Sequence, residues 1–321
     1  MPDKLTLGLA NAALYIRHYK IVRRYRRLIK RLPNIAHPKR YSERMIWRKL
    51  VDHNPLFVTF SDKLATKEYS RRVCPDLMLP RTLWVGNDAD DIPDPILHGN
   101  VFVKTNHGFN HNFCIRDGLV DRTKLKNRTD RWLKTIHGVE SSQWAYSMIQ
   151  PRLFVEEAIG DAEKDLLDIS IRAGNGQAIL GSVTGHNKKP DSWMVYLDLA
   201  GNPTAGVDDE DGGPFKTLPE GIDILNPYML AIEHTSKLSL GVDYARFDFM
   251  WNGKDLYGGE ITVYPAAGDH EIRNHSVHMA IQRGWNLENS HFLTAEHTGY
   301  KRVYANALRR SIKKIRNKNR F

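Results

Sequence analysis

A lysine that precedes a polar, glycine-containing segment is the first part of the sequence whose residue types could do chemistry. The apolar run 101–103 ends at Lys104, and the segment 105–112, which contains Gly108, leads into a second apolar run. This order predicts a strand, a loop and a second strand. Backbone N–H groups of such a loop can surround phosphate oxygens, and the lysine adds a positive charge. The alternative is an ordinary turn at Gly108 and a solvated Lys104.

Two carboxylates and a guanidinium occur together later in the chain. Alternation places Arg246 and Asp248 on one face of a predicted strand, Asn252-Gly253 predicts a turn, and the returning strand places Glu260 and Thr262 on one face. Two ionised carboxylates among apolar neighbours need a counter-charge. Mg²⁺ would supply it, because it binds through one or two carboxylates and substrate phosphates. The alternative is a structural ion pair between Arg246 and one of the acids.

The histidines and cysteines do not predict a zinc site. The two cysteines, Cys74 and Cys114, have no metal-ligand spacing and cannot form a disulfide framework, which favours a reducing cytoplasm. Without cysteine ligands or a closed set of other ligands, we do not predict zinc binding. The histidines that could suggest it are His107, His111, His270, His275 and His278.

Length and composition indicate a globular protein. With 321 residues, of which 41% are hydrophobic and 26% charged, the chain is long enough for two or three packed lobes. No segment approaches the ~20 apolar residues that cross a bilayer. The uncharged segment Leu5–Ile16 is too short, and the signal-peptidase-like Ala10–Ala12 has little apolar sequence before it, so we predict no cleaved signal.

Basic residues are concentrated at both ends of the chain. Residues 1–49 contain 14 Lys and Arg and 2 acids, a net charge of +12, and residues 301–321 contain 9 Lys and Arg and no acid, a net charge of +9. Residues 50–300 contain 24 bases and 35 acids, a net charge of −11. The overall charge of +10 therefore describes the ends and what they contact, while the body is acidic.

Each basic end is predicted to form an amphipathic helix, the first of them ended by Pro33. The predicted apolar stripes are Tyr15, Tyr19, Val22, Tyr25 and Ile29 at one end, and Tyr300, Tyr304, Leu308, Ile312 and Ile315 at the other. Such helices could lie on an anionic membrane surface. The alternative is that they pack on the body with their cations in water. Nucleic acid would satisfy the charges but would not need the apolar stripes.

A second lysine that could contact an anion lies at the predicted start of a helix. Ser61 or Asp62 is a suitable N-cap, and Lys63 falls in the first turn. A helix N-terminus already carries partial positive charge, so a lysine there makes sense if an anion binds nearby.

The remaining elements follow from periodicity and turn signals. A strand over 152–157 ends in Glu156 and Glu157, and Asn175-Gly176 predicts a hairpin. Other predicted elements are a strand over 79–85, helices over 131–149 and 227–240, and an acidic loop over 201–221.

In their order these pieces resemble the ATP-grasp superfamily, most closely the group related to the teichuronopeptide-synthesis protein, the TupA-like family. The resemblance covers about residues 53–272, and five motifs in the family's order make it specific. The motifs are Asp62-Lys63-Leu64 with Leu79-Pro80 at the entry to the fold, Phe102-Val103-Lys104 with the segment 105–112 as the phosphate-covering lid, Val155-Glu156-Glu157 as the adenine hinge, Arg246-Phe247-Asp248, and Gly259-Glu260-Ile261-Thr262.

The resemblance implies a set of ATP contacts. Lys63 and Lys104 would hold the phosphates, with His107 and Gly108 in the lid that covers them. The backbone around Glu156 and Glu157 would contact adenine. Asp168 would bind the ribose, with Asp165 as a rival.

It also implies a metal site and a catalytic arginine. Asp248 and Glu260 would bind Mg²⁺, and Arg246, with Lys104, would stabilise the acyl-phosphate and the tetrahedral intermediate that follows it. Two positions differ from the family. Thr262 stands where many members have an asparagine ligand, and Asp168-Ile169-Ser170 stands where relatives often have Asp-Tyr-Lys.

The implied fold is α+β, an ATP-grasp body with two basic helical extensions. The predicted divisions are a helical extension over 1–52, an N-terminal lobe over 53–100, a lid lobe over 101–154, a C-terminal lobe with the metal site over 155–299, and a basic helix over 300–321.

The implied reaction is ADP-forming ligation of a carboxylate to an amine through an acyl-phosphate, in the synthesis of a cell-surface polysaccharide or peptidyl polymer. The substrates could be glycan- or lipid-linked, and the enzyme would lie in the cytoplasm, peripheral to the inner face of the plasma membrane. The alternatives are a kinase that phosphorylates a hydroxyl and a non-catalytic membrane or nucleic-acid adaptor.

Overall fold

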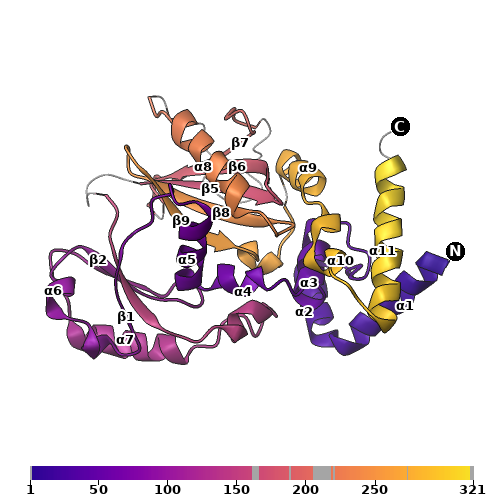
Figure 1. The fold of residues 1–321 in the computed structure, drawn as a ribbon, viewed down its shortest axis with the longest axis horizontal. Coiled ribbons are helices and arrows are strands. Elements are labelled where there is room, and N and C mark those ends of the chain that lie inside the picture. Colours follow the sequence, from indigo (N-terminus) through magenta and orange to yellow (C-terminus); the bar gives the residue numbers. More distant parts are fainter. Residues whose placement is uncertain are drawn as a thin grey trace.

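Two antiparallel sheets and a helical extension make up the molecule (Figure 1). The computed structural model describes residues 2–160, 166–187, 189–204, 218–219, 221–272 and 274–318. The predicted acidic loop over 201–221 lies largely outside the described residues.

The smaller sheet has the strand order β1-β4-β2-β3. Its strands are β1 (Thr82–Gly86), β4 (Leu153–Glu157), β2 (Val101–Thr105) and β3 (Asn112–Ile115). Val101 and Val103 of β2 are buried with Leu125 of α7 (Arg122–Lys134). Because side chains alternate along a strand, Lys104 lies on the opposite face, away from this core. The loop between β2 and β3, residues 106–111, is called the lid loop below.

The larger sheet has the order β7-β6-β5-β8-β9. Its strands are β7 (Trp193–Leu197), β6 (Gln177–Gly185), β5 (Leu167–Gly174), β8 (Ala245–Trp251) and β9 (Leu256–Thr262). Ile171 and Phe247 are buried in one core with Tyr228 of α8 (Leu225–Leu238), so Arg246 and Asp248 lie on the opposite face. The predicted hairpin joins β5 to β6, and the turn needs positive φ at Asn175 and Gly176.

Helix α5 (Lys63–Val73), preceded by α4 (Leu56–Ser61), brings Lys63 to the lid loop. Of the two predicted caps, the structure uses Asp62, whose Oδ1 accepts from the backbone N–H of Leu64 (2.9 Å). Its Oδ2 accepts from Asn106 Nδ2 (2.9 Å), and the Lys63 N–H donates to the Asn106 carbonyl (2.8 Å). The cap therefore fixes the start of α5 against the first residue of the lid loop.

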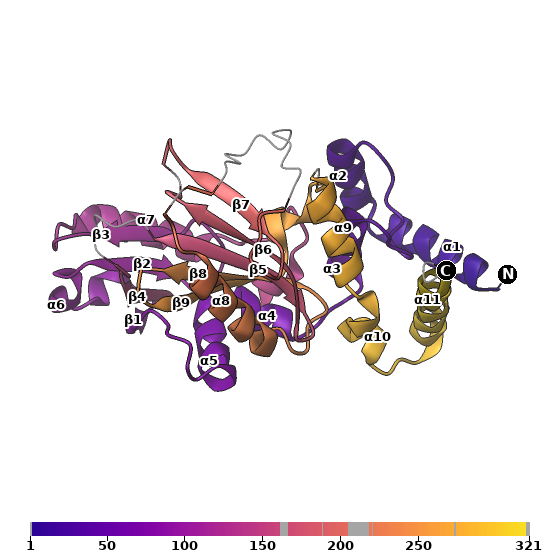
Figure 2. The same ribbon diagram turned by 90° about the horizontal axis from the view of Figure 1, so that it is seen from above.

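The helical extension is assembled from both ends of the chain, and Figure 2 shows it at one end of the molecule, beyond the larger sheet. Its long helices are α1 (Pro2–Arg17), α2 (Tyr19–Ile29), α3 (Tyr41–Leu50), α9 (His275–Gly284) and α11 (Gly299–Lys318). Shorter elements of the molecule are α6 (Asp94–Leu97), α10 (His291–Thr294), and 3-10 turns over Ala89–Asp91, Trp144–Met148, Pro265–Gly268 and Leu287–Asn289. Instead of one helix from Tyr15 to Ile29, there is a break at His18, whose φ and ψ (−122° and 37°) are not helical.

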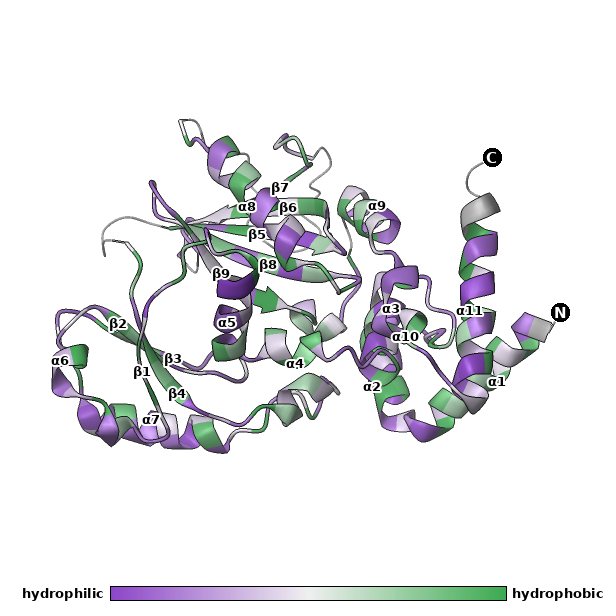
Figure 3. Cartoon of the chain, in the orientation of Figure 1, coloured by the Kyte–Doolittle hydropathy of each residue, from purple (hydrophilic) through white to green (hydrophobic). Residues whose placement is uncertain are grey.

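Four residues of the predicted stripes are buried inside the extension. Val22 and Tyr25 of α2 and Tyr304 and Leu308 of α11 belong to one core cluster, and α1 packs against α11. The Tyr304 hydroxyl donates to the Ala36 carbonyl (3.0 Å). These residues therefore serve packing, which was the alternative to membrane contact, while hydrophilic residues predominate along the visible surface of α11 in Figure 3. Among the described helices, none has the length and apolar character needed to cross a membrane.

A buried ion pair joins the extension to the larger sheet. Arg48 of α3 donates from Nη2 to Asp243 Oδ1 (2.6 Å), and both side chains are completely buried. Trp285 Nε1 donates to the other oxygen of Asp243 (2.6 Å), and Arg48 Nη1 donates to the Val263 carbonyl (2.8 Å). Because the charges are paired and hydrogen-bonded on several sides, the extension is an integral part of the body.

One predicted helix is wrong, and two predicted divisions cross the smaller sheet. The chain is not helical over residues 135–143, where Gly138 and Ser142 have positive φ, and α7 lies earlier because Asp121 caps it. The predicted boundary after residue 154 falls inside β4, and β1 from the preceding segment belongs to the same sheet. The division into lobes stays a prediction.

Candidate active site

A cleft of about 690 Å³ between the two sheets collects most of the predicted site residues. Alternation in β2, β5, β8 and β9 turns polar side chains toward it while the apolar ones fill the cores. Eight of the ten predicted site residues line this cleft: Lys63, Lys104, Gly108, Glu156, Asp168, Arg246, Asp248 and Glu260.

Lys63 connects the lid loop to the larger sheet. Its Nζ donates to the Gly108 carbonyl (2.5 Å) and lies 3.2 Å from Glu260 Oε1. The lysine therefore fixes the middle of the lid loop at the cleft, and its positive charge partly neutralises the Glu260 carboxylate.

Glu156 of β4 accepts hydrogen bonds from two lysines. Lys104 Nζ donates to Oε1, and Lys67 Nζ donates to Oε2 (2.6 Å). Lys67 also donates to the Pro80 carbonyl (2.8 Å) and is almost fully buried. Burial lowers the pKa of the Lys67 ammonium, and the Glu156 carboxylate works against that effect.

The opposite end of the cleft continues into a second cavity of about 430 Å³. Lys104, Glu156 and Asp168 line both cavities, and Glu157 lines the second. The Glu157 carboxylate accepts from Arg81 Nε (2.7 Å); burial favours the neutral acid, but this pairing outweighs it and lowers the pKa of Glu157. Asp168 accepts from Asn187 Nδ2 (2.5 Å). Asp165, the rival ribose ligand, lies outside the described residues.

Arg246 and Asp248 form a paired group on the cleft face of β8. Arg246 Nε donates to Asp248 Oδ1 (2.7 Å) and Nη2 donates to Oδ2 (2.7 Å). Ser170 Oγ donates to Asp248 Oδ1 (2.7 Å), and Arg246 Nη2 donates to Thr262 Oγ1 (3.3 Å). The charge of Asp248 raises the pKa of the arginine. The ion pair that the sequence left as an alternative is thus present.

Glu260 of β9 is the carboxylate most open to the cleft, with 56% of its side chain exposed. Partial desolvation by the surrounding protein would by itself raise the pKa of the carboxyl group. Lys63, followed by Lys104 and Arg246, outweighs this effect and lowers the pKa. Glu260 is therefore held ionised in a strongly positive surrounding.

The oxygen ligands present in the cleft fit a magnesium ion. Asp248 and Glu260 offer carboxylate oxygens from neighbouring strands to one cleft. An ionised carboxylate has about four acceptor positions, and the Asp248 oxygens already accept four hydrogen bonds from Arg246 and Ser170, so a metal ion would replace one of these bonds. Carboxylate oxygens, completed by substrate phosphates, are the donors that Mg²⁺ prefers.

Two cleft residues escaped the sequence analysis. Lys67 lies one helical turn after Lys63, and this i, i+4 spacing could have indicated it. Arg172 lies on the same face of β5 as Asp168 and Ser170, and alternation could have indicated it as well. Arg172 supplies a cation two residues after Ser170, near the place where relatives often carry their lysine.

Of the ten predicted residues, His107 is the one whose side chain lines neither cavity. It is 2% exposed, and its Nε2 lies 3.1 Å from the Thr135 carbonyl. Only its neighbour Gly108 lines the cleft.

Comparison with known proteins places this cleft in a family. A family model described as TupA-like ATP-grasp matches residues 43–280. The chain belongs to the TupA-like ATP-grasp family. The matched residues include both sheets, most of α3 and all of α4 to α8, whereas α1, α2, α10 and α11 lie outside them. The predicted family and the predicted α+β ATP-grasp fold with helical extensions are confirmed.

Solved structures similar to this chain include ATP-grasp ligases, and no match was found among curated proteins. D-alanine–D-alanine ligase from Bacillus anthracis, complexed with ATP, has 12% identity and a TM-score of 0.37 over 81% of this chain and 67% of that chain. D-alanine–D-alanine ligase from Helicobacter pylori has 12% identity and a TM-score of 0.42 over 71% and 61%. L-amino acid ligase from Bacillus licheniformis has 12% identity and a TM-score of 0.42 over 71% and 50%. This chain thus spans between half and two thirds of the length of these ligases.

Proposed function

We propose that the chain is an ATP-dependent, ADP-forming carboxylate–amine ligase. The observation that carries this proposal is the meeting of Lys63, Lys104, Arg246, Asp248 and Glu260 in one cleft of a TupA-like ATP-grasp protein. Phosphoryl transfer needs cations around the moving group and a divalent cation on the phosphates, and catalysis consists largely of positioning them. These five residues provide that arrangement.

ATP would lie along the two connected cavities. The adenine and ribose would occupy the second cavity, between the hinge at Glu156 and Glu157 and the carboxylate of Asp168. The phosphates would extend into the larger cleft toward Lys63 and Lys104. In this arrangement Lys104 leaves Glu156, which keeps its hydrogen bond from Lys67 and so stays neutralised.

The first step forms an acyl-phosphate. A carboxylate oxygen of the substrate bonds to the γ-phosphorus, the bond from that phosphorus to the β–γ bridging oxygen breaks, and ADP leaves with the electron pair. Mg²⁺, held by Asp248 and Glu260, would neutralise phosphate charge during this transfer. Lys63 and Lys104 donate to phosphate oxygens whose charge grows.

The second step forms the amide. The amine nitrogen bonds to the acyl carbon and the carbonyl oxygen takes up negative charge. The carbonyl then re-forms, phosphate leaves with the electrons of the C–O bond, and the proton lost by the nitrogen passes to this phosphate. Arg246 would donate to the developing oxyanion. Its guanidinium is fixed by Asp248 and so needs no rearrangement during the reaction.

Arg172 is the residue we propose to hold the substrate carboxylate. Its Nη1 is buried without a hydrogen-bond partner among the described residues, although its side chain lines the cleft. A guanidinium binds a carboxylate through two parallel hydrogen bonds, which also orients it. This contact would place the substrate beside the γ-phosphate.

Release of ADP tests the reaction. Purified protein with ATP and Mg²⁺ is screened against uronic-acid glycans, amino acids and peptides as carboxylates, each with and without candidate amines. A ligase releases ADP in proportion to the amide it forms and needs both substrates. Sustained ADP release with a hydroxyl acceptor and no amine would instead indicate a kinase, and absence of ATP binding would indicate an adaptor. Screening glycans and peptides also tests the proposed role in a cell-surface polymer.

We also propose an anionic membrane surface as a partner of the helical extension, where lipid-linked substrates would be available. Two features support this proposal. Both ends of the chain have a net positive charge, and the apolar side chains of Leu5, Leu9 and Ile16 lie exposed on one face of α1. Cosedimentation with phosphatidylglycerol vesicles at low salt tests it, with phosphatidylcholine vesicles for comparison. Replacing Arg23, Arg26 and Arg27 by Gln should reduce binding, while replacing the exposed Arg71, Arg72 and Lys254, which lie outside the extension, should not. Protein that stays in the supernatant at low salt would remove the membrane from the proposal.

A further inference from the structure

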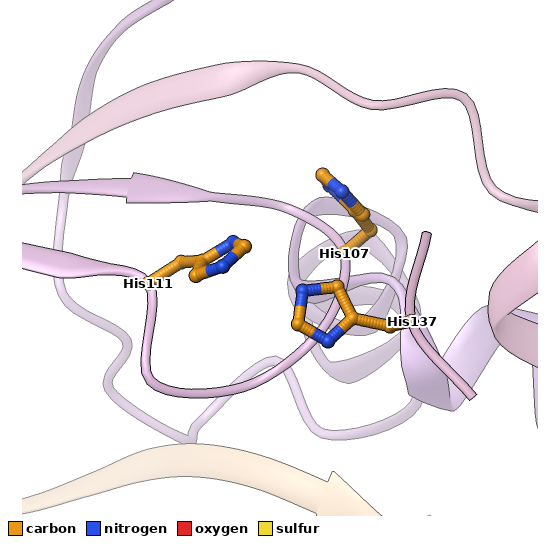
Figure 4. A group of neighbouring side chains, drawn as sticks. All are labelled: His107, His111 and His137. Carbon is orange, nitrogen blue, oxygen red and sulfur yellow. The ribbon is translucent and has the colours of Figure 1, made fainter. Parts of the chain in front are cut away.

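Three histidines that do not line the ATP cleft lie together beside the lid loop. His107 and His111 belong to the loop, and His137 follows α7 (Figure 4). One ring nitrogen from each lies within 4.8 Å of the other two. The sequence did not predict this group, because His137 is distant along the chain and only folding brings it to the other two.

Hydrogen bonds fix which nitrogen of His107 carries a proton. Its Nε2 lies 3.1 Å from the Thr135 carbonyl, which can only accept, so Nε2 carries the proton. In the neutral ring, Nδ1 then has the lone pair. This Nδ1 is buried and has no hydrogen-bond partner among the described residues.

The same reasoning assigns His111. The Thr105 hydroxyl donates its proton to the His107 carbonyl (2.8 Å), so toward His111 Nδ1 (3.0 Å) it can only accept. His111 therefore carries its proton on Nδ1 and its lone pair on Nε2. Trp132 stacks on the His111 ring at 5.1 Å between centroids and holds its plane.

His137 closes the group. Its side chain is 9% exposed, its Nε2 is buried without a partner, and its ring centroid lies 4.5 Å from that of His111 and 5.4 Å from that of His107. Burial, together with the neighbouring histidines and Lys63, lowers the pKa of His111 and of His137 to about 4. Three neutral rings packed together, two of them with an unpartnered buried nitrogen, would be costly unless something binds them.

We propose that His107, His111 and His137 form a binding site for a divalent transition metal, with Zn²⁺ the best fit. Three imidazoles with one position left open are a common tetrahedral zinc site, and the hydrogen bonds from His107 and His111 to Thr135 and Thr105 are the outer contacts that orient metal-binding histidines. Zinc–nitrogen bonds of about 2.0–2.1 Å require ligand nitrogens roughly 3.3 Å apart. The ligand nitrogens would therefore approach one another by up to about 1.5 Å on binding. Mg²⁺, which prefers oxygen, does not fit this site.

Such a metal would restrain the lid loop. Gly108 lies between the two loop histidines, and its carbonyl accepts from Lys63 on the cleft side. Gly108 has φ +75°, and a Cβ there would lie 2.1 Å from the His137 ring, so the loop and His137 are already in close contact. The metal would join the lid loop to residues 135–138 and restrict the loop proposed to cover the ATP phosphates. The metal site itself does not depend on that proposed function.

Metal binding to the full, tag-free chain tests the proposal. After chelation and dialysis, the protein is titrated with Zn²⁺ by calorimetry and with Co²⁺ by visible absorption, and bound zinc is counted by mass spectrometry. We expect one ion per chain and the intense visible bands of tetrahedral Co²⁺. His137→Gln, which keeps a polar side chain of similar size, should abolish the site, and Thr105→Val should weaken it roughly 10–100-fold by removing an outer contact. His275→Gln, at an exposed histidine of α9, should bind like the unaltered protein.

Hydrogen exchange gives a second readout that needs no variant. Bound Zn²⁺ should slow exchange in residues 105–112 and 135–138 and leave β6 and β7 unchanged. The proposal is overturned if the unaltered chain binds no stoichiometric zinc, if His137→Gln binds it as well as His275→Gln does, or if zinc leaves exchange in the lid loop unchanged. None of these results bears on ATP-dependent ADP release.

Discussion

Arg172 of β5 lies directly opposite Arg246 of β8 in the antiparallel pairing, and both side chains line the same cleft. Like charges directly opposite each other on a sheet are destabilising. Asp248 neutralises Arg246 through two hydrogen bonds, whereas Arg172 has an unpartnered, buried Nη1 among the described residues. This arrangement supports the proposal that an anionic substrate group in the cleft supplies the second negative charge.

Replacing Arg172 by Met should therefore affect the carboxylate substrate and not the nucleotide. Loss of a charge-assisted pair should raise KM for the carboxylate roughly 10–100-fold with little change in ATP affinity. Steady-state kinetics measure the first quantity and calorimetry with a non-hydrolysable ATP analogue the second. Arg172→Lys, which keeps charge but loses the planar fork, should be intermediate. A variant with weakened ATP binding and unchanged KM would assign Arg172 to the phosphates instead.

Lys104→Ala should weaken ATP binding roughly 10–100-fold, because one charged donor to the phosphates is lost. Glu156 would stay paired with Lys67, so the fold should be preserved. The matched control is Lys126→Ala. Lys126 lies on α7, and its ammonium pairs with Asp88 and with Asp130. Calorimetric titration with the ATP analogue measures both variants. Equal affinity in the two would remove Lys104 from the nucleotide site.

Asp248→Asn and Glu260→Gln should each reduce turnover by roughly 100-fold or more, because the charge that would hold Mg²⁺ on the phosphates is reduced. Both changes keep the shape of the side chain. Glu233→Gln, on the exposed surface of α8, is the control. ADP release as a function of Mg²⁺ concentration separates weaker metal binding from a slower chemical step. Full turnover at ordinary Mg²⁺ in either variant would contradict the metal assignment, provided that melting curves show intact folding.

Asp52→Asn should change how stability depends on pH. Burial, reinforced by the charge of Asp243, raises the pKa of Asp52 to about 7, although Arg48 and the Phe292 N–H act in the opposite direction. Protonated Asp52 thus contributes stability that is fully present below about pH 4 and is lost as pH rises through 7. Asparagine does not ionise, so the unfolding free energy of the variant should exceed that of the unaltered protein increasingly between these values, by up to about 4 kcal/mol. Denaturant unfolding at several pH values measures the difference, and parallel pH curves would contradict the prediction.

The residues that strand alternation controls were the most predictable part of the site. Arg246, Asp248 and Glu260 lie on cleft faces because their neighbours Phe247 and Ile261 must be buried, and this pattern is legible in the sequence. The cap at Asp62 was similarly local. The Asn175-Gly176 turn and α8 also followed from local signals.

What depended on contacts between distant segments could not be predicted. His137 joins His107 and His111 only because the chain after α7 folds back onto the lid loop. The stripes of α2 and α11 look alike whether a membrane or another helix covers them, since both remove apolar surface from water. Their burial was decided by the core around Trp47 and Trp285.

The contact between α1 and α11 has a consequence for how the protein folds as it is synthesised. Asp3 accepts hydrogen bonds from Arg310 (2.6 Å and 3.0 Å), 307 positions later in the chain, and Leu7 packs in the same cluster as Leu308. Contacts of such long sequence separation form slowly, because the entropy of closing the chain must be overcome first. While the ribosome is still making α11, the apolar residues of α1 that pack against it, such as Leu7, lack this partner. Part of the apolar surface of α1 is therefore covered only after the last helix has been made, and until then it remains available for incorrect association.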